Sequence, residues 1–142
     1  MKTTVLLSIK GQQSYAGQEP EVIELVTEGV LEQTADGWII TYEESDLTGM
    51  QGVTTRFAVD EGKLTLTRTG KLNSQMVFQE GVRHESLYQM EFGARMLSVC
   101  ARKIRTDLTP DGGEIELSYG IEIEQSEAGI IDYYLKIQRK NA

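Results

Sequence analysis

Cysteine, histidine and proline are scarce in this chain, which has one Cys, one His and two Pro among its 142 residues. A single cysteine, Cys100, excludes an intrachain disulfide framework, and we expect a cytoplasmic protein. One His and one Cys are also too few for a zinc site built from these ligands. We therefore expect neither a metal ion nor another cofactor.

Long apolar runs and an excess of positive charge are missing as well. No run approaches the roughly 20 apolar residues that span a bilayer. Ser8 and Lys10 interrupt the apolar start of the chain and no small-residue cleavage site follows, so we interpret it as a strand rather than a signal peptide. The net charge of −8 disfavours binding to nucleic acid or to a membrane. We interpret the basic cluster Arg102, Lys103 and Arg105 as solvating a strand edge.

What the chain does have is a turn signal about every ten residues. Glycine after Asp, Glu or Ala supplies the positive φ that tight hairpins need, and both prolines, Pro20 and Pro110, fall in these turns. The predicted turns lie near residues 17–20, 35–37, 46–52, 60–62, 71–74, 79–81, 92–93, 109–113 and 126–129. They divide the chain into about ten segments.

Between the turns, apolar and polar residues alternate with a period of two. In the most regular segment Ile115, Leu117 and Tyr119 share one parity, while Glu114 and Glu116 take the other. This period is typical of strands with one buried face, and short connections favour antiparallel neighbours.

Pairing the first strand with the last would remove two exposed edges. The sequence therefore predicts an all-β fold with one domain over residues 1–142. We expect a closed, antiparallel, up-and-down barrel of about 8–10 strands, with a two-sheet sandwich as the alternative.

Two segments fit a strand less well. Residues 93–105 contain good helix formers, but we interpret them as one long strand because their neighbours are hairpins. The segment 21–35 is rich in glutamate and has Gly29 in its middle, which costs a helix about 1 kcal/mol relative to Ala. In a strand, Gly29 would mark a β-bulge that shifts the alternation.

One inward row of the predicted barrel contains an arginine. Leu64, Leu66 and Arg68 share a parity, so a strand places Arg68 on the core-facing side. An unpaired buried charge costs on the order of several kcal/mol, so Arg68 needs a partner. Three partners are open: Glu44, which follows Tyr42 on an inward parity; solvent at the barrel rim; or the anionic group of a ligand.

A barrel of this size is wide enough to leave a lumen. We expect the lumen to bind a small amphipathic or anionic molecule, with its apolar body buried and its acidic end paired with Arg68. The candidate site residues are Arg68, Glu44, His84, Tyr42, Phe78, Tyr88 and Tyr119. His84 also suits a structural histidine, and Phe78 and Tyr88 also suit a filled core; both of these interpretations are the more common use of such residues.

Several stretches resemble the YwiB-like family of Firmicute proteins, a family of unknown function. The motif-like pieces are Tyr42-Glu43, Gly52-Val53-Thr54-Thr55, Leu66-Thr67-Arg68-Thr69-Gly70, and Met76-Val77-Phe78 followed by Gly81. The resemblance runs over nearly the whole chain. It implies a calycin-like β-barrel, the architecture of lipocalins and fatty-acid-binding proteins, and it brings no known activity, substrate or catalytic residue.

Two other functions stay open. A barrel with a filled core would act through its outer face, and a surface hydrophobe such as Ile39 leaves room for a homodimer. Alternatively, Glu43, Glu44 and Asp46 cluster at the barrel mouth, where paired carboxylates divide acid and base roles. Because the chain has no nucleotide-binding, metalloprotease or serine-elbow motif, we predict no catalytic residue.

Overall fold

The computed structural model describes residues 2–14, 18–45, 51–90, 93–123 and 126–140, which form ten β-strands. The strands are β1 (Lys2–Ser14), β2 (Glu21–Gln33), β3 (Gly37–Glu43), β4 (Val53–Asp60), β5 (Lys63–Gly70), β6 (Ser74–Phe78), β7 (Arg83–Met90), β8 (Gly93–Thr109), β9 (Gly112–Ile123) and β10 (Ser126–Arg139). Within these residues, no helix has the length and apolar character needed to cross a membrane.

All ten strands belong to one antiparallel sheet, in the order β6-β5-β4-β3-β2-β1-β10-β9-β8-β7. The first and last strands pair from Val5–Arg139 to Ser14–Ile130, as expected from the removal of exposed edges. Every other ladder joins strands that follow one another in the sequence. The predicted fold class, an all-β up-and-down barrel, is confirmed.

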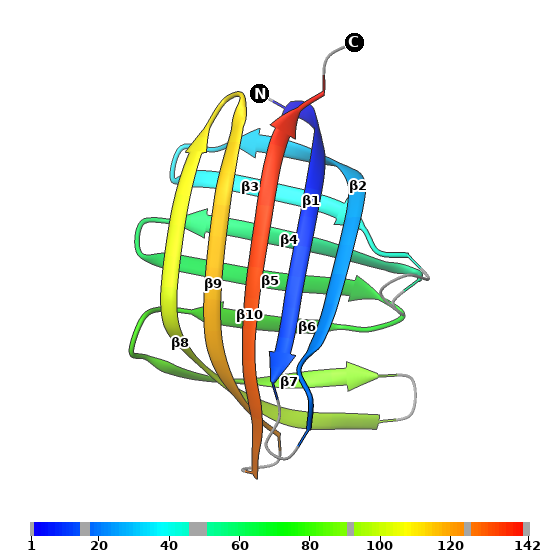
Figure 1. Ribbon diagram of the computed structural model, residues 1–142, viewed down its shortest axis with the longest axis vertical. Coiled ribbons are helices and arrows are strands. Elements are labelled where there is room, and N and C mark those ends of the chain that lie inside the picture. Colours follow the sequence, from blue (N-terminus) through cyan, green and yellow to red (C-terminus); the bar gives the residue numbers. More distant parts are fainter. Residues whose placement is uncertain (1, 15–17, 46–50, 91–92, 124–125, 141–142) are drawn as a thin grey trace.

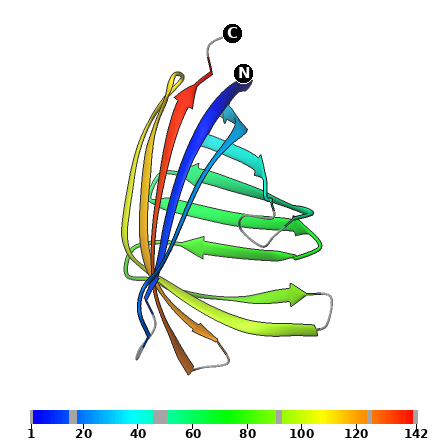
Figure 2. The same ribbon diagram turned by 45° about the vertical axis from the view of Figure 1, so that its right-hand side comes forward.

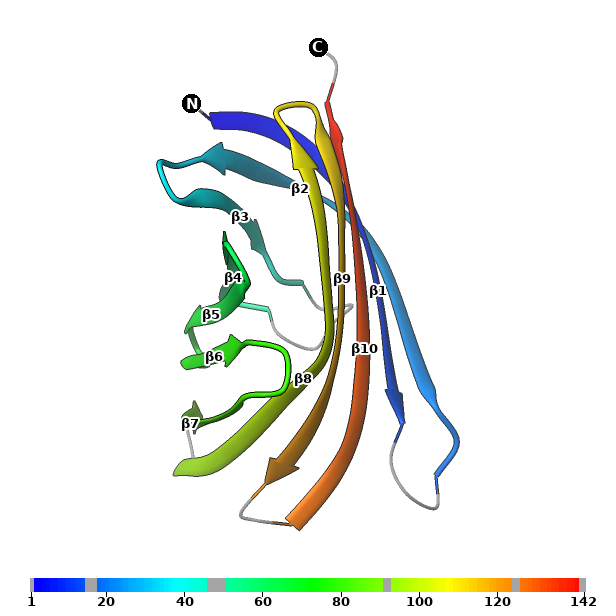
Figure 3. The ribbon, with the colours of Figure 1, turned by 90° about the vertical axis from the view of Figure 1, so that its left-hand side faces the viewer.

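The sheet curls into two layers that face each other. The long strands β1, β2, β8, β9 and β10 form one layer, and the shorter strands β3 to β7 run across behind it (Figure 1). The same two layers are seen from the side in Figures 2 and 3. Inward-facing side chains of both layers therefore meet between them, as in other curled sheets.

The seam of the barrel lies between β6 and β7. Within the described residues these two strands share no ladder. Two isolated antiparallel bridges flank them: Gln79–Val82 at the connecting turn, and Asn73–Gln89, where the two residues exchange backbone N–H···O bonds of 3.0 and 2.9 Å. Just before β7, the Gly81 N–H donates to the carbonyl of Ala101 in β8 at 3.0 Å. The barrel is thus nearly closed, and its seam falls in the middle of the sequence.

The two ambiguous segments are both strands. Residues 93–105 belong to the continuous strand β8, as interpreted. However, β2 keeps its register through Gly29, so the bulge predicted there is wrong. Gly29 instead permits close packing, since a Cβ at this position would lie 2.7 Å from both the Thr41 carbonyl oxygen and Leu7 Cδ1.

The last predicted turn is displaced. Residues 126–129 lie in β10 rather than in a turn, because β9 ends at Ile123 and β10 begins at Ser126. The glycine signal at Gly129 has a different cause: the register with β9 shifts between Glu127 and Gly129, as at a β-bulge.

Packed side chains fill one end of the barrel, where β2 leads into β3 and β8 into β9. Each large apolar side chain buried there contributes about 1.5–3 kcal/mol of hydrophobic stabilisation. The members that are at most 2% exposed include Val5, Leu7, Leu31, Ile40, Phe57, Leu64, Phe78, Ile115 and Leu135. At this end the lumen is filled by side chains, as in the alternative hypothesis of a barrel with a filled core.

Candidate functional site

A cavity of about 410 Å³ occupies the opposite end of the barrel, where β1 leads into β2, β3 into β4 and β9 into β10. Ligand pockets typically measure about 300–1,000 Å³. The lining residues are Ile9, Gly11, Gln13, Ile23, Leu25, Tyr42, Glu44, Arg68, Met76, Arg95, Leu97, Tyr119, Ile121, Ile123, Ile131 and Tyr133. The walls are mainly aliphatic and aromatic, with three charged side chains among them.

A glycine helps to leave this end of the lumen open. The inward row of β1 continues from Ile9 through Gly11 to Gln13. A Cβ built at Gly11 would meet only Tyr133, at 3.9 Å. A larger side chain here would therefore extend into the cavity without striking the backbone.

Arg68 and Glu44 form an ion pair at the cavity floor. Arg68 Nε lies 3.8 Å from Glu44 Oε2, and the two side chains are 14% and 1% exposed. The same Glu44 oxygen accepts a hydrogen bond of 2.5 Å from the hydroxyl of Thr55, a fully buried residue of β4. Of the three expected partners of Arg68, the structure thus shows the Glu44 carboxylate, and the Arg68 side chain also lines the cavity.

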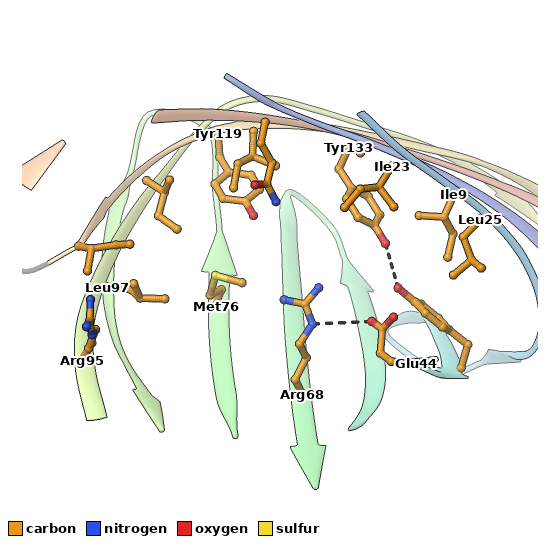
Figure 4. A pocket seen from close by; sticks show the side chains of 16 residues that line it. Ile9, Ile23, Leu25, Glu44, Arg68, Met76, Arg95, Leu97, Tyr119 and Tyr133 are labelled. Atoms are coloured by element: carbon orange, nitrogen blue, oxygen red, sulfur yellow. Dashed lines mark hydrogen bonds and ion pairs between the residues drawn. The ribbon is translucent and has the colours of Figure 1, made fainter. Parts of the chain in front are cut away.

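The Arg68 guanidinium keeps unused hydrogen-bonding capacity. Its Nε is buried without a hydrogen-bond partner among the described residues, and so is Oγ of Ser74, the residue opposite it across the β5–β6 ladder. In Figure 4 the terminal nitrogens point from the floor toward the opposite wall, which carries Tyr119 and Tyr133. Because buried polar atoms without partners are rare and costly, this part of the floor can accept one more polar group.

Two tyrosine hydroxyls meet at the side of the cavity. Tyr42 of β3 and Tyr133 of β10 are joined by a 2.9 Å hydrogen bond between their hydroxyl oxygens (Figure 4). Burial, together with the nearby Glu44 carboxylate, raises the pKa of Tyr42 from 10.0 to about 12. Burial and the contact with Tyr42 also raise the pKa of Tyr133 well above its usual value. Both hydroxyls therefore remain neutral hydrogen-bonding groups beyond the pH at which free tyrosine ionises.

The raised tyrosine pKa values predict a loss of stability in alkali. Below pH about 10 the Tyr42 hydroxyl is protonated in both the folded and the unfolded chain, so its contribution is complete. Between pH about 10 and 12 only the unfolded chain ionises at this residue, and the free energy of unfolding should fall by about 1.4 kcal/mol per pH unit. Urea unfolding at several pH values measures this slope. Tyr42→Phe should make the slope less steep by about this amount, while Tyr133 continues to contribute to it, whereas equal slopes for the variant and the parent would contradict the assignment.

The cavity brings together four of the seven predicted site residues: Arg68, Glu44, Tyr42 and Tyr119. Phe78 is not in the lining. It is fully buried in the core and packs behind Tyr119, with ring centroids 4.6 Å apart. Phe78 therefore supports the cavity wall from behind Tyr119 and, contrary to the prediction, does not line the cavity.

The other two predicted residues lie on β7. His84 is half-buried, is not part of the cavity lining, and its Nε2 lies 2.8 Å from Gln79 Oε1. This hydrogen bond matches the structural histidine of our alternative interpretation. Tyr88 is outside the set of residues whose side chains the structure describes.

The neighbouring carboxylates at the end of β3 do not share a site. Glu43 is exposed and accepts bonds of 2.9 Å from the Thr54 hydroxyl, whereas Glu44 points inward to Thr55. Asp46 lies outside the described residues. In the described part of the chain, no group of three or more His, Cys, Asp or Glu side chains is placed to hold a metal ion.

Sequence reasoning missed three polar residues of the cavity lining, Gln13, Arg95 and Tyr133, and the last two matter most for its chemistry. Both carried a usable signal: Arg95 shares its parity with Leu97 and Val99 of β8, and Tyr133 lies in the inward row of β10. The argument that singled out Arg68, a polar residue in an apolar row, would have found them.

Comparison with known proteins agrees with this architecture. The model of a domain of unknown function, DUF1934, matches residues 7–137. The "Uncharacterized beta-barrel protein YwiB" of Bacillus subtilis (strain 168) is 28% identical over 123 residues, which cover 86% of this chain and 84% of that protein. The crystal structure of YwiB from Bacillus subtilis is similar with a TM-score of 0.88 and 23% identity, over 99% of this chain and 94% of that one. The resemblance expected from the sequence is confirmed, and the chain belongs to the DUF1934 family.

Proposed function

We propose that the barrel binds a small amphipathic molecule, with the acidic end of the ligand on Arg68 and its apolar part against the cavity walls. The observation that carries this proposal is an unfilled, mainly apolar cavity with a guanidinium at its floor whose Nε lacks a hydrogen-bond partner among the described residues. Two conditions would speak against such a site: a filled lumen, and an Arg68 fully bonded to Glu44. The first is not met, because a cavity of about 410 Å³ is present.

The second condition is met only in part. The distance of 3.8 Å between Arg68 Nε and Glu44 Oε2 is too long for a hydrogen bond, and Glu44 is also bonded to Thr55. A ligand carboxylate could approach the terminal nitrogens of Arg68 while Glu44 keeps its bond to Thr55. Arginine favours such paired contacts with carboxylate or phosphate oxygens.

The charge of the cavity lining supports an anionic ligand. Arg68, Arg95 and Glu44 are its charged members, with a formal charge of +1, whereas the whole chain carries −8. Arg95 stands apart from Arg68 in the lining, with Met76 and Leu97 between them (Figure 4). A cationic ligand would gain less, because it would face two arginines in a partly desolvated site.

Displacement of a fluorescent dye tests this proposal. The probe is anilinonaphthalene sulfonate, which is itself apolar with an anionic group, and the competitors are decanoate and decanol. We expect decanoate to displace the dye at a concentration about tenfold or more below decanol, because a hydrogen bond to a charged group contributes about 1.5–3 kcal/mol. Arg68→Met should remove this preference, and Arg56→Met, on the outer face of the adjacent strand β4, should preserve it.

A second pair of variants tests the cavity independently of Arg68. Gly11→Leu should fill the cavity and abolish dye binding, since a Cβ there has no backbone within 4 Å. Gly120→Leu is the matched control, because its Cβ would also meet nothing within 4 Å and Gly120 does not line the cavity. Equal dye binding by the two folded variants, or equal displacement by decanoate and decanol, would overturn the proposal.

A further inference from the structure

Apart from the seam between β6 and β7, part of strand β8 also has an edge without a neighbouring strand in the described part of the chain. β8 pairs with β7 from Gly93 to Cys100, but it pairs with β9 as far as Thr109. Within the described residues, the second edge of β8 from Lys103 to Thr109 therefore carries no strand. A groove of about 610 Å³ lies beside this edge, with Ile104, Arg105 and Thr106 on one side and residues of the β4–β5 turn and the β6–β7 connection on the other.

The hydrogen bonds show which backbone groups face the free edge. The N–H of Ile104 points away from β9, because it donates to Glu80 Oε1 at 2.8 Å. In a strand the N–H and C=O of one residue point to the same side, and every second residue repeats that direction. Thr106 and Leu108 therefore also present their backbone groups outward. Such an unpaired edge is a template for another strand.

The sequence along this edge is complementary to itself. In an antiparallel pairing with a two-fold axis at Thr106, Ile104 faces Leu108 of the second copy and Arg105 faces Asp107, each twice. The Arg105–Asp107 pairs fall at the positions without hydrogen bonds, where side chains approach most closely. Apolar residues thus meet on one face and opposite charges on the other.

Neighbouring registers are less favourable. A two-fold axis at Ile104 would set Lys103 against Arg105, and an axis at Arg105 would set Arg105 against itself. An axis at Asp107 would oppose two aspartates. Since like charges directly opposite destabilise a strand pair, the register centred on Thr106 is the one that the charges select.

Within one copy these charges are poorly balanced. Arg105 shares a single carboxylate with Lys103: Glu116 lies 3.8 Å from the former and 3.4 Å from the latter. Asp107 lies opposite Glu114 in the β8–β9 register, and it has no ion pair among the described residues. A second copy would supply an ion-pair partner for Asp107 and a further carboxylate for Arg105.

We propose that two copies of this chain associate through the free edge of β8, with the antiparallel register centred on Thr106. This goes beyond ligand binding and does not depend on the cavity. The interface is short, so we expect a reversible dimer at the weak end of the range for specific complexes. The Glu80 carboxylate already accepts a hydrogen bond from the Ile104 N–H. This limits how many residues of the edge can pair with the second copy.

Sedimentation velocity tests the proposal, with the full chain at concentrations from about 10 µM to 1 mM. We expect a concentration-dependent shift from monomer to dimer. Thr106→Pro removes an N–H that the isolated barrel does not use, so it should weaken association about tenfold or more while the circular dichroism spectrum stays unchanged. Thr106→Val keeps that N–H and should associate like the parent.

A charge exchange separates this register from any other contact. Arg105→Asp and Asp107→Arg should each weaken self-association, because each creates like-charge pairs across the axis. Mixing the two variants should restore association, since each copy then faces opposite charges at both positions. A parent chain that stays monomeric at the highest concentration, a dimer unaffected by Thr106→Pro, or folded variants that fail to associate when mixed would each overturn the proposal.

Discussion

Phe78→Ala is expected to lower the free energy of unfolding by about 4 kcal/mol, as is typical when a large buried aromatic side chain is truncated. Phe78 is fully buried, and it joins the filled end of the lumen to the cavity wall through its contact with Tyr119. The loss combines reduced apolar burial with the void left behind, because the packed side chains around Phe78 relax only partly into the space. Urea or thermal unfolding measures it.

A conservative variant and a binding assay complete this test. Phe78→Leu should cost less, about 1–1.5 kcal/mol, because most of the volume is kept. Dye binding by either folded variant should persist, since Phe78 does not line the cavity. A loss below about 1 kcal/mol for Phe78→Ala would show that the side chain does not support the core as its burial implies.

Arg68→Met is the second substitution with a large expected effect, a loss of about 3 kcal/mol in the free energy of unfolding. It would remove a cation that lies 3.8 Å from a carboxylate that is 1% exposed, and so reduce the compensation of the buried Glu44 charge. If Arg68 were instead stabilised mainly by solvent at the rim, the loss would stay within about 0.5 kcal/mol.

A double substitution isolates the role of the ion pair. Glu44→Gln in the Arg68→Met background removes the negative charge of the buried carboxylate, and it retains an oxygen that accepts the Thr55 hydrogen bond. The free energy of unfolding should then return to within about 1 kcal/mol of the parent. Arg56→Met is the control for loss of an exposed arginine. A double variant no more stable than Arg68→Met would rule out the buried pair as the cause.

The strand pattern and the inward polar residues could be predicted because both follow from a period of two. The alternation of Leu64, Leu66 and Arg68 predicts that Arg68 faces the core. The alternation of Tyr42 and Glu44 in another segment predicts the same for Glu44. Strand-to-strand connections were equally predictable where glycine stands at a two- or three-residue turn. Such local rules need only neighbouring residues.

What could not be predicted depends on contacts between distant strands. Glycine signals a bulge, a turn and a close approach alike, and only the approach of the Thr41 carbonyl oxygen to Gly29 shows which applies. The same limit holds for the cavity: parity placed Phe78 and Tyr119 in the lumen, but not which of them faces the open end. The position of a side chain along the barrel axis depends on how neighbouring strands are staggered. The sequence of a single strand does not contain this information.

The pairing of β1 with β10 has a consequence for how the chain reaches its fold. Most ladders of the sheet connect consecutive strands and can form within short pieces of chain, but this one joins Val5 to Arg139. Two local meanders, β1 to β6 and β7 to β10, therefore depend on one contact of high sequence separation, whose loop-closure cost slows folding. Until β10 has been synthesised, the outer edge of β1 stays exposed to other chains. The step most open to misassembly is thus the one that makes the two halves a single barrel.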